Sequence, residues 1–230
     1  MNGVETVDNY NRETCSPVHW TDYLCFNQGP MPGAVAPDFD LPTITGDWFR
    51  LSDHRGERPV LFEFTSITSP IAAATRSSVR MLYSEFGDEV WFVSIYAREA
   101  NPGKRYPRPA SFAEKMQHAD QWAERDRITW TVAVDWLEGR THQAYGGLPN
   151  LTYLIDRTGH VAFRSFWSGQ RKLLRRILRK LLRLQSKASG VIDLGESRSF
   201  MAPLLLGTSA GPRSKRFLHT LGGLCCRLWA

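Results

Sequence analysis

The sequence predicts an α/β domain in which helices sandwich a mixed central β-sheet. Short apolar segments rich in β-branched and aromatic residues alternate with helical stretches between residues 34 and 184. The last two apolar segments are separated by only five residues, which predicts a hairpin at one side of the sheet. With 230 residues and 42% hydrophobic content, the chain can form one core of ordinary size with an extension at each end.

The first half of this region predicts three strands and two helices. A short strand over 47–51 follows a turn at 43–46. The near-continuous apolar run at 60–64 is typical of a strand covered on both faces, and 90–96 is a second strand rich in β-branched and aromatic residues. Helices are predicted over 71–86 and 111–127.

The second half predicts a strand at 130–134 and a short helix at 138–145. Strands at 151–155 and 161–166 flank turn residues that can reverse the chain, and a helix from 170 to about 184 closes the domain. Two parallel strands joined by a helical crossover, then a hairpin and a final helix, are typical of the thioredoxin-like fold.

Several local motifs resemble those of the redoxin families, which include the alkyl hydroperoxide reductase/thiol-specific antioxidant (AhpC/TSA) proteins. The residues that resemble the N-terminal part of these families' sequences are APDFDLP at 36–42, Gly46, LSD at 51–53, Gly56 and PVL at 59–61. Farther along, IYAREANP at 95–102 and AYG at 144–146 resemble the iodothyronine deiodinase branch and its bacterial relatives. The resemblance covers residues 34–184 and implies a redox site between the strand at 60–64 and the helix that follows.

The position that would hold the redox nucleophile is Ser69. It ends the loop before the helix, where Ser69 is expected as the N-cap and Pro70 as the first helical residue. A cysteine there would be stabilised as a thiolate by the unpaired N–H groups and dipole of the helix. A serine hydroxyl without a neighbouring base stays protonated and cannot pass through sulfenate or disulfide states.

The other positions that the resemblance implies also depart from the family patterns. A thioredoxin-type pair would need cysteines at Ser69 and Ala72, and a peroxiredoxin-type site would need proline, threonine or serine, and cysteine at Phe62, Ser66 and Ser69. The deiodinase pattern would place cysteine or selenocysteine at Ser69, and histidines at Asn101 and near Pro109. Only Ser66 and Glu99 match, so the resemblance implies a degenerate site.

Two further features of this region remain candidates for function. Glu63 occupies the place of the buried carboxylate that relays protons to the thiols of thioredoxins. It could be an acid or base with a raised pKa, or its side chain could reach the edge of the sheet or pair with a nearby arginine. Pro149 occupies the place of the family's cis-proline. A peptide-binding groove would comprise Thr68, Ser69, Leu148 and Pro149, with strand addition at Leu148 and hydroxyls also offered by Ser66. The alternative is a groove retained only as scaffold.

The cysteines and histidines predict neither a metal site nor a disulfide framework. The four cysteines, which lie in the extensions and form no CxxC pair, are Cys15, Cys25, Cys225 and Cys226. The six histidines show no paired ligand spacing and are expected in tails, loops and helix surfaces. With no Gly-rich phosphate loop, no cofactor is predicted. No apolar run is long enough to span a membrane and no secretory signal is recognisable, so a cytoplasmic location is expected.

The region 170–187 concentrates basic charge on an amphipathic helix. It carries eight basic residues, so the rest of the chain has a net charge of −2 within the total of +6. Leucines and an isoleucine form the opposite stripe. Either the apolar stripe packs on the sheet and the charges are simply solvated, or the basic face binds anionic lipid, nucleic acid or an acidic partner. Because no aromatic residues are interleaved with the charges, binding to single-stranded nucleic acid is disfavoured. The predicted face consists of Arg171, Lys172, Arg175, Arg176, Arg179, Lys180 and Arg183.

We therefore predict an N-terminal extension at 1–33, a thioredoxin-like domain at 34–188 and a flexible C-terminal tail at 189–230. The predicted function is a non-catalytic binding or scaffold module. One alternative is a thiol-dependent oxidoreductase that reduces peroxides or disulfides with Cys15 and Cys25. The other is a peripheral protein that uses the basic helix to bind a membrane or an acidic partner.

Overall fold

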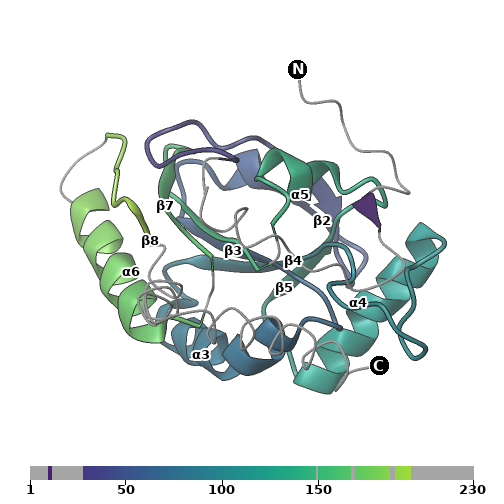
Figure 1. The fold of residues 1–230 in the computed structure, drawn as a ribbon. Helices are drawn as coiled ribbons and strands as arrows, with labels where there is room; N and C mark the ends of the chain where they lie inside the picture. The colour runs from purple at the N-terminus through teal and green to yellow at the C-terminus, as the bar shows by residue number, and fades with distance from the viewer. Residues whose placement is uncertain (1–9, 12–27, 149, 167–168, 187–189, 198–230) are drawn as a thin grey trace, which may run out of the picture.

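The computed structural model of the chain describes residues 10–11, 28–148, 150–166, 169–186 and 190–197. It confirms the α/β class and the mixed sheet flanked by helices (Figure 1). The strand order of the six-stranded sheet is β5-β4-β3-β6-β7-β8. These strands are β3 (Val60–Thr65), β4 (Trp91–Tyr96), β5 (Thr131–Val134), β6 (Thr152–Ile155), β7 (Val161–Ser165) and β8 (Glu196–Ser197).

The pairing of the strands is mixed, as predicted. Strands β3, β4 and β5 are parallel, whereas β6 is antiparallel to both β3 and β7. The carboxyl ends of β3 and β4 therefore lie side by side at one edge of the sheet, and the loops that follow them are neighbours. The candidate site lies at this edge.

Helices cover one face of the sheet. Successive side chains of each strand point to opposite faces, so every second side chain packs against these helices. Leu61 and Phe92 pack against α3 (Pro70–Phe86) and α6 (Arg171–Gln185), and Tyr96 packs against α4 (Phe112–Asp126). These three helices begin and end within two residues of the predicted bounds.

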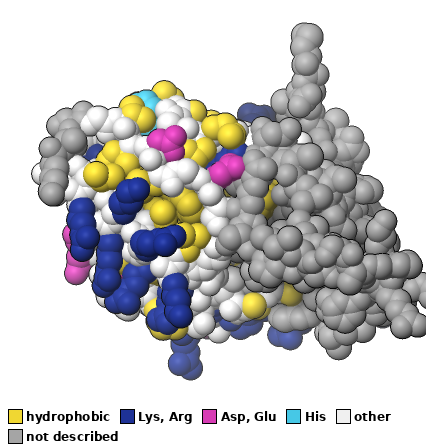
Figure 2. Space-filling model, turned by 60° about the vertical axis from the view of Figure 1, so that its left-hand side comes forward, with side chains coloured by type: hydrophobic (Ala, Val, Ile, Leu, Met, Phe, Trp, Pro, Cys, Tyr) yellow, Lys and Arg dark blue, Asp and Glu magenta, His cyan; other side chains and the backbone are white. Residues whose placement is uncertain are grey.

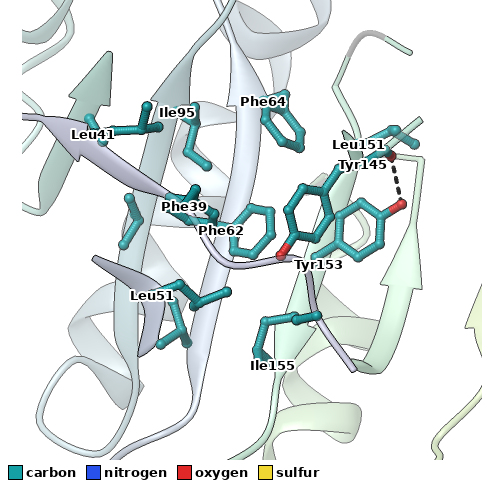
Figure 3. Close-up of a cluster of buried hydrophobic side chains, with 14 of the residues drawn as sticks. Phe39, Leu41, Leu51, Phe62, Phe64, Ile95, Tyr145, Leu151, Tyr153 and Ile155 are labelled. Carbon is teal, nitrogen blue, oxygen red and sulfur yellow. Dashed lines mark hydrogen bonds between the residues drawn. The ribbon is translucent and has the colours of Figure 1, made fainter. Parts of the chain in front are cut away.

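The opposite face is covered by α5 (Arg140–Ala144) and by the small antiparallel sheet of β1 (Asp40–Pro42) and β2 (Trp48–Arg50). Figure 3 shows the core beneath them, where Phe62 of β3 lies among Phe39, Tyr145 and Tyr153. The strand at 47–51 is shorter than predicted because a 3₁₀ helix starts at Leu51 (Leu51–His54), and its partner β1 was not predicted.

Parts of both predicted extensions contact the domain. Tyr10 is buried, and the backbone N–H of Gly33 donates to the carbonyl of Val161. Within the predicted tail, β8 pairs with β7 and Ile192 joins the core. All four cysteines lie outside the described residues.

Candidate functional site

The junction between β3 and α3 holds Ser69 at the N-terminus of the helix, as predicted. The Oγ atom of Ser69 accepts a hydrogen bond from the backbone N–H of Ala72 at 3.1 Å, and Pro70 is the first helical residue. The same hydroxyl donates to Oδ1 of Asn150 at 2.8 Å. The Ser69 residue is only 3% exposed, so its hydroxyl is enclosed and satisfied by two neutral groups.

The side-chain hydroxyl groups of Ser66 and Thr68 link this loop to the loop after β4 through hydrogen bonds. The backbone N–H of Ala100 donates to Ser66 Oγ, and that of Asn101 donates to Thr68 Oγ1, both at 3.1 Å. The Asn101 side-chain amide also donates to the Thr68 carbonyl at 3.1 Å. The two loops are therefore held together by partly buried hydrogen bonds, and the buried residues Ser66 and Thr68 take part in internal contacts.

Glu99 is the centre of this buried network. Its carboxylate accepts from the hydroxyl of Thr68 at 2.6 Å and from that of Tyr96 at 2.5 Å. Nδ1 of His118, in α4, lies 3.2 Å from the same carboxylate. Burial, followed by the charge of Glu99, raises the pKa of the Tyr96 phenol. Of the predicted site residues, the structure thus brings together Ser66, Thr68 and Glu99.

Sequence reasoning missed Tyr96 and His118. The expectation that the histidines lie in tails, loops and helix surfaces is wrong for His118 and His142, which are buried. The sequence signal that could have revealed the buried position of His118 is the helical spacing of Lys115, His118 and Trp122, which form one buried stripe of α4. Because two of these three are polar, the stripe looks like a solvated face.

Glu63 lies on the other side of the loop, beneath α3. Its carboxylate accepts from the hydroxyl of Ser94 at 3.2 Å, and that hydroxyl accepts in turn from the indole N–H of Trp130 at 2.9 Å. Glu63 lines a small gap between the sheet and the apolar faces of α3 and α6. Its predicted acid or base role stays a prediction.

The loop expected to carry the cis-proline faces Ser69 through Asn150, whose backbone has φ of +60°. Pro149 itself lies outside the described residues, so its isomer stays a prediction. The carbonyl of Leu148 accepts from Nε2 of His142 at 2.9 Å, while Nδ1 of His142 accepts from the hydroxyl of Tyr10 at 2.8 Å. One lone pair of the Leu148 carbonyl is therefore already used within the domain.

Burial perturbs the titratable groups around this loop. It lowers the pKa of His142 to about 3, helped by the charge of Arg98, so the imidazole is neutral. Burial also lowers the pKa of Lys115 to about 8, and Nζ of Lys115 donates to the carbonyl of Trp136. Burial raises the pKa of Asp135, although the Lys115 charge and the backbone N–H groups of His142 and Thr141 oppose this change.

The described part of the chain contains no cluster of three or more histidine, cysteine, aspartate or glutamate side chains that could hold a metal ion. Among its helices, none has the length and apolar character needed to cross a bilayer. The predicted cytoplasmic location is not tested by this observation.

The sequence matches the model of the AhpC/TSA family over residues 32–164, which is more than half of the chain. The chain belongs to the AhpC/TSA family. This AhpC/TSA chain is also 25% identical over 158 residues to a thyroxine 5-deiodinase of Gallus gallus, a match that covers 64% of the chain and 61% of the deiodinase. The predicted redoxin resemblance with a deiodinase-like pattern is thereby confirmed.

Solved structures show the same fold. The peroxidoxin BcpB of Mycobacterium tuberculosis superposes with a TM-score of 0.52 and 21% identity, covering 70% of this AhpC/TSA chain and 99% of BcpB. A thiol:disulfide interchange protein of the thioredoxin family from Chlorobium tepidum superposes with a TM-score of 0.51 and 17% identity, covering 65% and 96%. At these identities the likeness establishes the thioredoxin-like fold alone, as predicted.

Proposed function

We propose that this AhpC/TSA domain is a non-catalytic binding or scaffold module. The observation that carries the proposal is the state of the Ser69 hydroxyl, which is buried between the Ala72 N–H and the Asn150 amide oxygen. Serine catalysis requires a base that removes the hydroxyl proton. Here that proton is directed to a neutral amide oxygen, which is far too weakly basic to take it.

The acid and base groups nearby support this proposal because they bind other partners. The carboxylate of Glu99 accepts from Thr68 and Tyr96, and His118 contacts that same carboxylate. The network therefore fixes the shape of the loop beside Ser69. A thiol mechanism would in addition need a cysteine, and the described residues contain none.

The proposed binding surface is the groove predicted between the N-terminus of α3 and the segment that follows α5. We predict that Thr68 and Ser69 line one side and that Leu148 lines the other, while Pro149, the fourth predicted member, lies outside the described residues. Because the hydroxyls of Ser66, Thr68 and Ser69 are engaged within the domain, an extended peptide would be held through its main chain and by shape.

A thiol-dependent oxidoreductase that uses Cys15 and Cys25 is the second candidate. It is favoured only by similarity, because the chain belongs to the AhpC/TSA family and shares its fold with a peroxidoxin and a thiol:disulfide interchange protein. Both cysteines lie outside the described residues, so no geometry supports this candidate.

Turnover assays separate the candidates. The wild-type chain, Ser69→Ala, and the double variant Cys15→Ser/Cys25→Ser would be assayed with hydrogen peroxide, insulin disulfides and thyroxine, with dithiothreitol as reductant. We expect all three proteins to match the reductant-only blank. Wild-type turnover that disappears in the double variant would establish the oxidoreductase, and turnover that disappears in Ser69→Ala would establish catalysis by serine; either result would overturn the non-catalytic proposal.

A further inference from the structure

Helix α6 presents a continuous basic surface that the candidate site does not use. The basic face, defined as the seven lysines and arginines of α6, lies opposite Leu174, Ile177, Leu178 and Leu181, which are buried in the core. The helix contains no acidic residue. Figure 2 shows lysine and arginine side chains gathered on one side of the described surface, with hydrophobic side chains among and beside them.

Most of this charge is not neutralised within the described part of the chain. Glu85 of α3 pairs with Arg175 at 2.7 Å and with Arg179 at 2.9 Å, so one carboxylate serves two guanidinium groups. Lys172, Arg176, Lys180 and Arg183 form no ion pair with any described residue. A strong positive field therefore remains at this face.

The arrangement of the charges disfavours the helix itself. Lys172, Arg176 and Lys180 follow one another at four-residue spacing, so like charges face each other along the helix. Arg171 and Lys172 also lie in the first turn, where the dipole favours anions, and Gln170 makes no side-chain capping hydrogen bond. Alternating glutamate and lysine would solvate this face equally well without the repulsion, so folding does not account for the all-basic pattern.

We propose that the basic face of α6 binds the surface of an anionic phospholipid bilayer. Clusters of four to eight lysines and arginines on an amphipathic helix are typical of binding to anionic headgroups. Apart from Arg171, the cations of the basic face line a shallow surface depression together with the exposed side chain of Leu184. Exposed Met81 lies beside the helix, where its sulfur contacts Arg171. The surface thus combines cations with aliphatic groups, which suits a headgroup layer.

Other polyanions fit this surface less well. The side chains that line the depression include no aromatic ring on which a base could stack, which disfavours single-stranded nucleic acid. A helix that enters the groove of a nucleic-acid duplex must protrude from the protein, whereas α6 lies flat against α3 and the sheet (Figure 1). Because the apolar stripe of α6 is buried in the core, the contact with lipid is electrostatic, without insertion of the helix, and sensitive to salt.

Vesicle co-sedimentation of the full chain tests this proposal. The probes are vesicles of phosphatidylcholine alone and of phosphatidylcholine with about one third phosphatidylserine, at low and high salt. The test variant is Lys172→Gln/Arg176→Gln/Lys180→Gln. The matched control removes the same charge from exposed positions elsewhere, as Lys104→Gln/Arg140→Gln/Arg157→Gln.

We expect the wild-type chain to bind only the vesicles that contain phosphatidylserine, and we expect high salt to abolish this binding. Binding should be at least tenfold weaker for the α6 variant and within twofold of wild type for the control. Absence of wild-type binding, binding that ignores lipid charge or salt, or an equal loss in both variants would overturn the proposal. Tighter binding to a duplex or single-stranded oligonucleotide, or to polyglutamate, than to the vesicles would also overturn it. Far-ultraviolet circular dichroism checks that each variant is folded. Residues 198–230 also carry basic residues, and they are retained in every protein so that their charge is the same throughout.

Discussion

The side-chain oxygen of Ser69 decides which chemistry is open to the loop before α3. This position receives an N–H from the first turn of a 17-residue helix, which is the environment that stabilises a thiolate in redox proteins. A hydroxyl in the same place stays protonated and caps the helix. The contrast between oxygen and sulfur can be tested directly, because the surrounding groups are already in place.

Replacing Ser69 by cysteine should produce a thiol with a lowered pKa. We expect the pH midpoint of its thiolate ultraviolet absorbance, taken as the difference from the wild type, to lie at least one unit below the ordinary value of about 8.5, because the Ala72 N–H and the helix dipole stabilise the thiolate. The matched control is Ser84→Cys, exposed on the same helix but far from its N-terminus, with an expected midpoint of about 8.5. Subtracting the wild-type titration removes the contribution of the four native cysteines. Equal midpoints would show that the helix N-terminus no longer activates this position.

Glu99 should contribute substantially to stability. The change Glu99→Gln replaces one carboxylate oxygen with an NH₂ group, which cannot accept from Thr68, Tyr96 or His118. We expect the free energy of unfolding in urea to fall by about 1–3 kcal/mol. The exposed substitution Glu57→Gln, as control, should change it by less than about 0.5 kcal/mol. A loss for Glu99→Gln as small as that of the control would contradict a structural role for the network.

His142 should make the domain sensitive to acid. In the folded chain its pKa is lowered to about 3, whereas in the unfolded chain it is about 6.5. Between these values the unfolded chain binds a proton that the folded chain does not, so the free energy of unfolding falls as the pH drops below 6.5. From pH 7 to pH 5 this effect should remove about 2 kcal/mol in the wild type and be missing in His142→Gln. Urea titrations of both proteins at the two pH values measure the difference, and parallel losses would rule out His142 as the titrating group.

Among the elements, α6 was the easiest to predict and β1 the hardest. The leucine stripe of α6 repeats with helical period over 15 residues, and the structure buries it as the pattern indicates. In contrast, β1 has only three residues, one of them Pro42, and its pairing with β2 depends on the core beneath it. Short strands defined by tertiary contacts leave little periodicity in a sequence.

The candidate site was only partly predictable for a related reason. Ser66, Ser69 and Glu99 stand at positions that the family resemblance marks, whereas the Glu99 contact of His118 comes from a distant helix. The contact of Tyr10 with His142 joins residues 132 positions apart. No local pattern encodes either contact, and both require the folded sheet to bring the elements together.

The repulsion along α6 should be measurable as a gain in stability when it is relieved. In Lys172→Gln/Arg176→Gln/Lys180→Gln, two like-charged pairs at four-residue spacing are removed, and glutamine is as good a helix former as lysine. We expect the melting temperature at low salt to rise by about 2 °C, with a smaller rise at high salt. Thermal unfolding followed by circular dichroism provides the measurement. A lower melting temperature would mean that these cations stabilise the fold, and that folding alone explains them.

For the whole molecule, the guanidinium of Arg164 joins the two ends of the domain. Arg164 lies in β7 and is completely buried. Its Nη1 donates to the carbonyls of Gln28 and Pro30 from the N-terminal side, at 3.0 and 3.2 Å. Its Nε and Nη2 lie 2.8 and 2.7 Å from the carboxylate of Glu196 in β8. The charge of this buried cation is therefore balanced by a residue from the segment predicted as tail.

Truncation should therefore be tolerated after residue 197 but not after residue 189. Removing 198–230 leaves β8 and Glu196 in place, whereas removing 190–230 takes away Ile192 of the core and the carboxylate partner of Arg164. Because a buried charge that loses its partner is strongly destabilising, we expect the shorter chain to lose about 3 kcal/mol or more in urea unfolding relative to the chain that ends at 197. Glu196→Gln in the full-length chain isolates the charge from the loss of the strand and should reproduce a large part of this deficit. If the two truncated chains are equally stable, residues 190–197 do not close the domain, and the charge of Arg164 must be balanced from elsewhere in the fold.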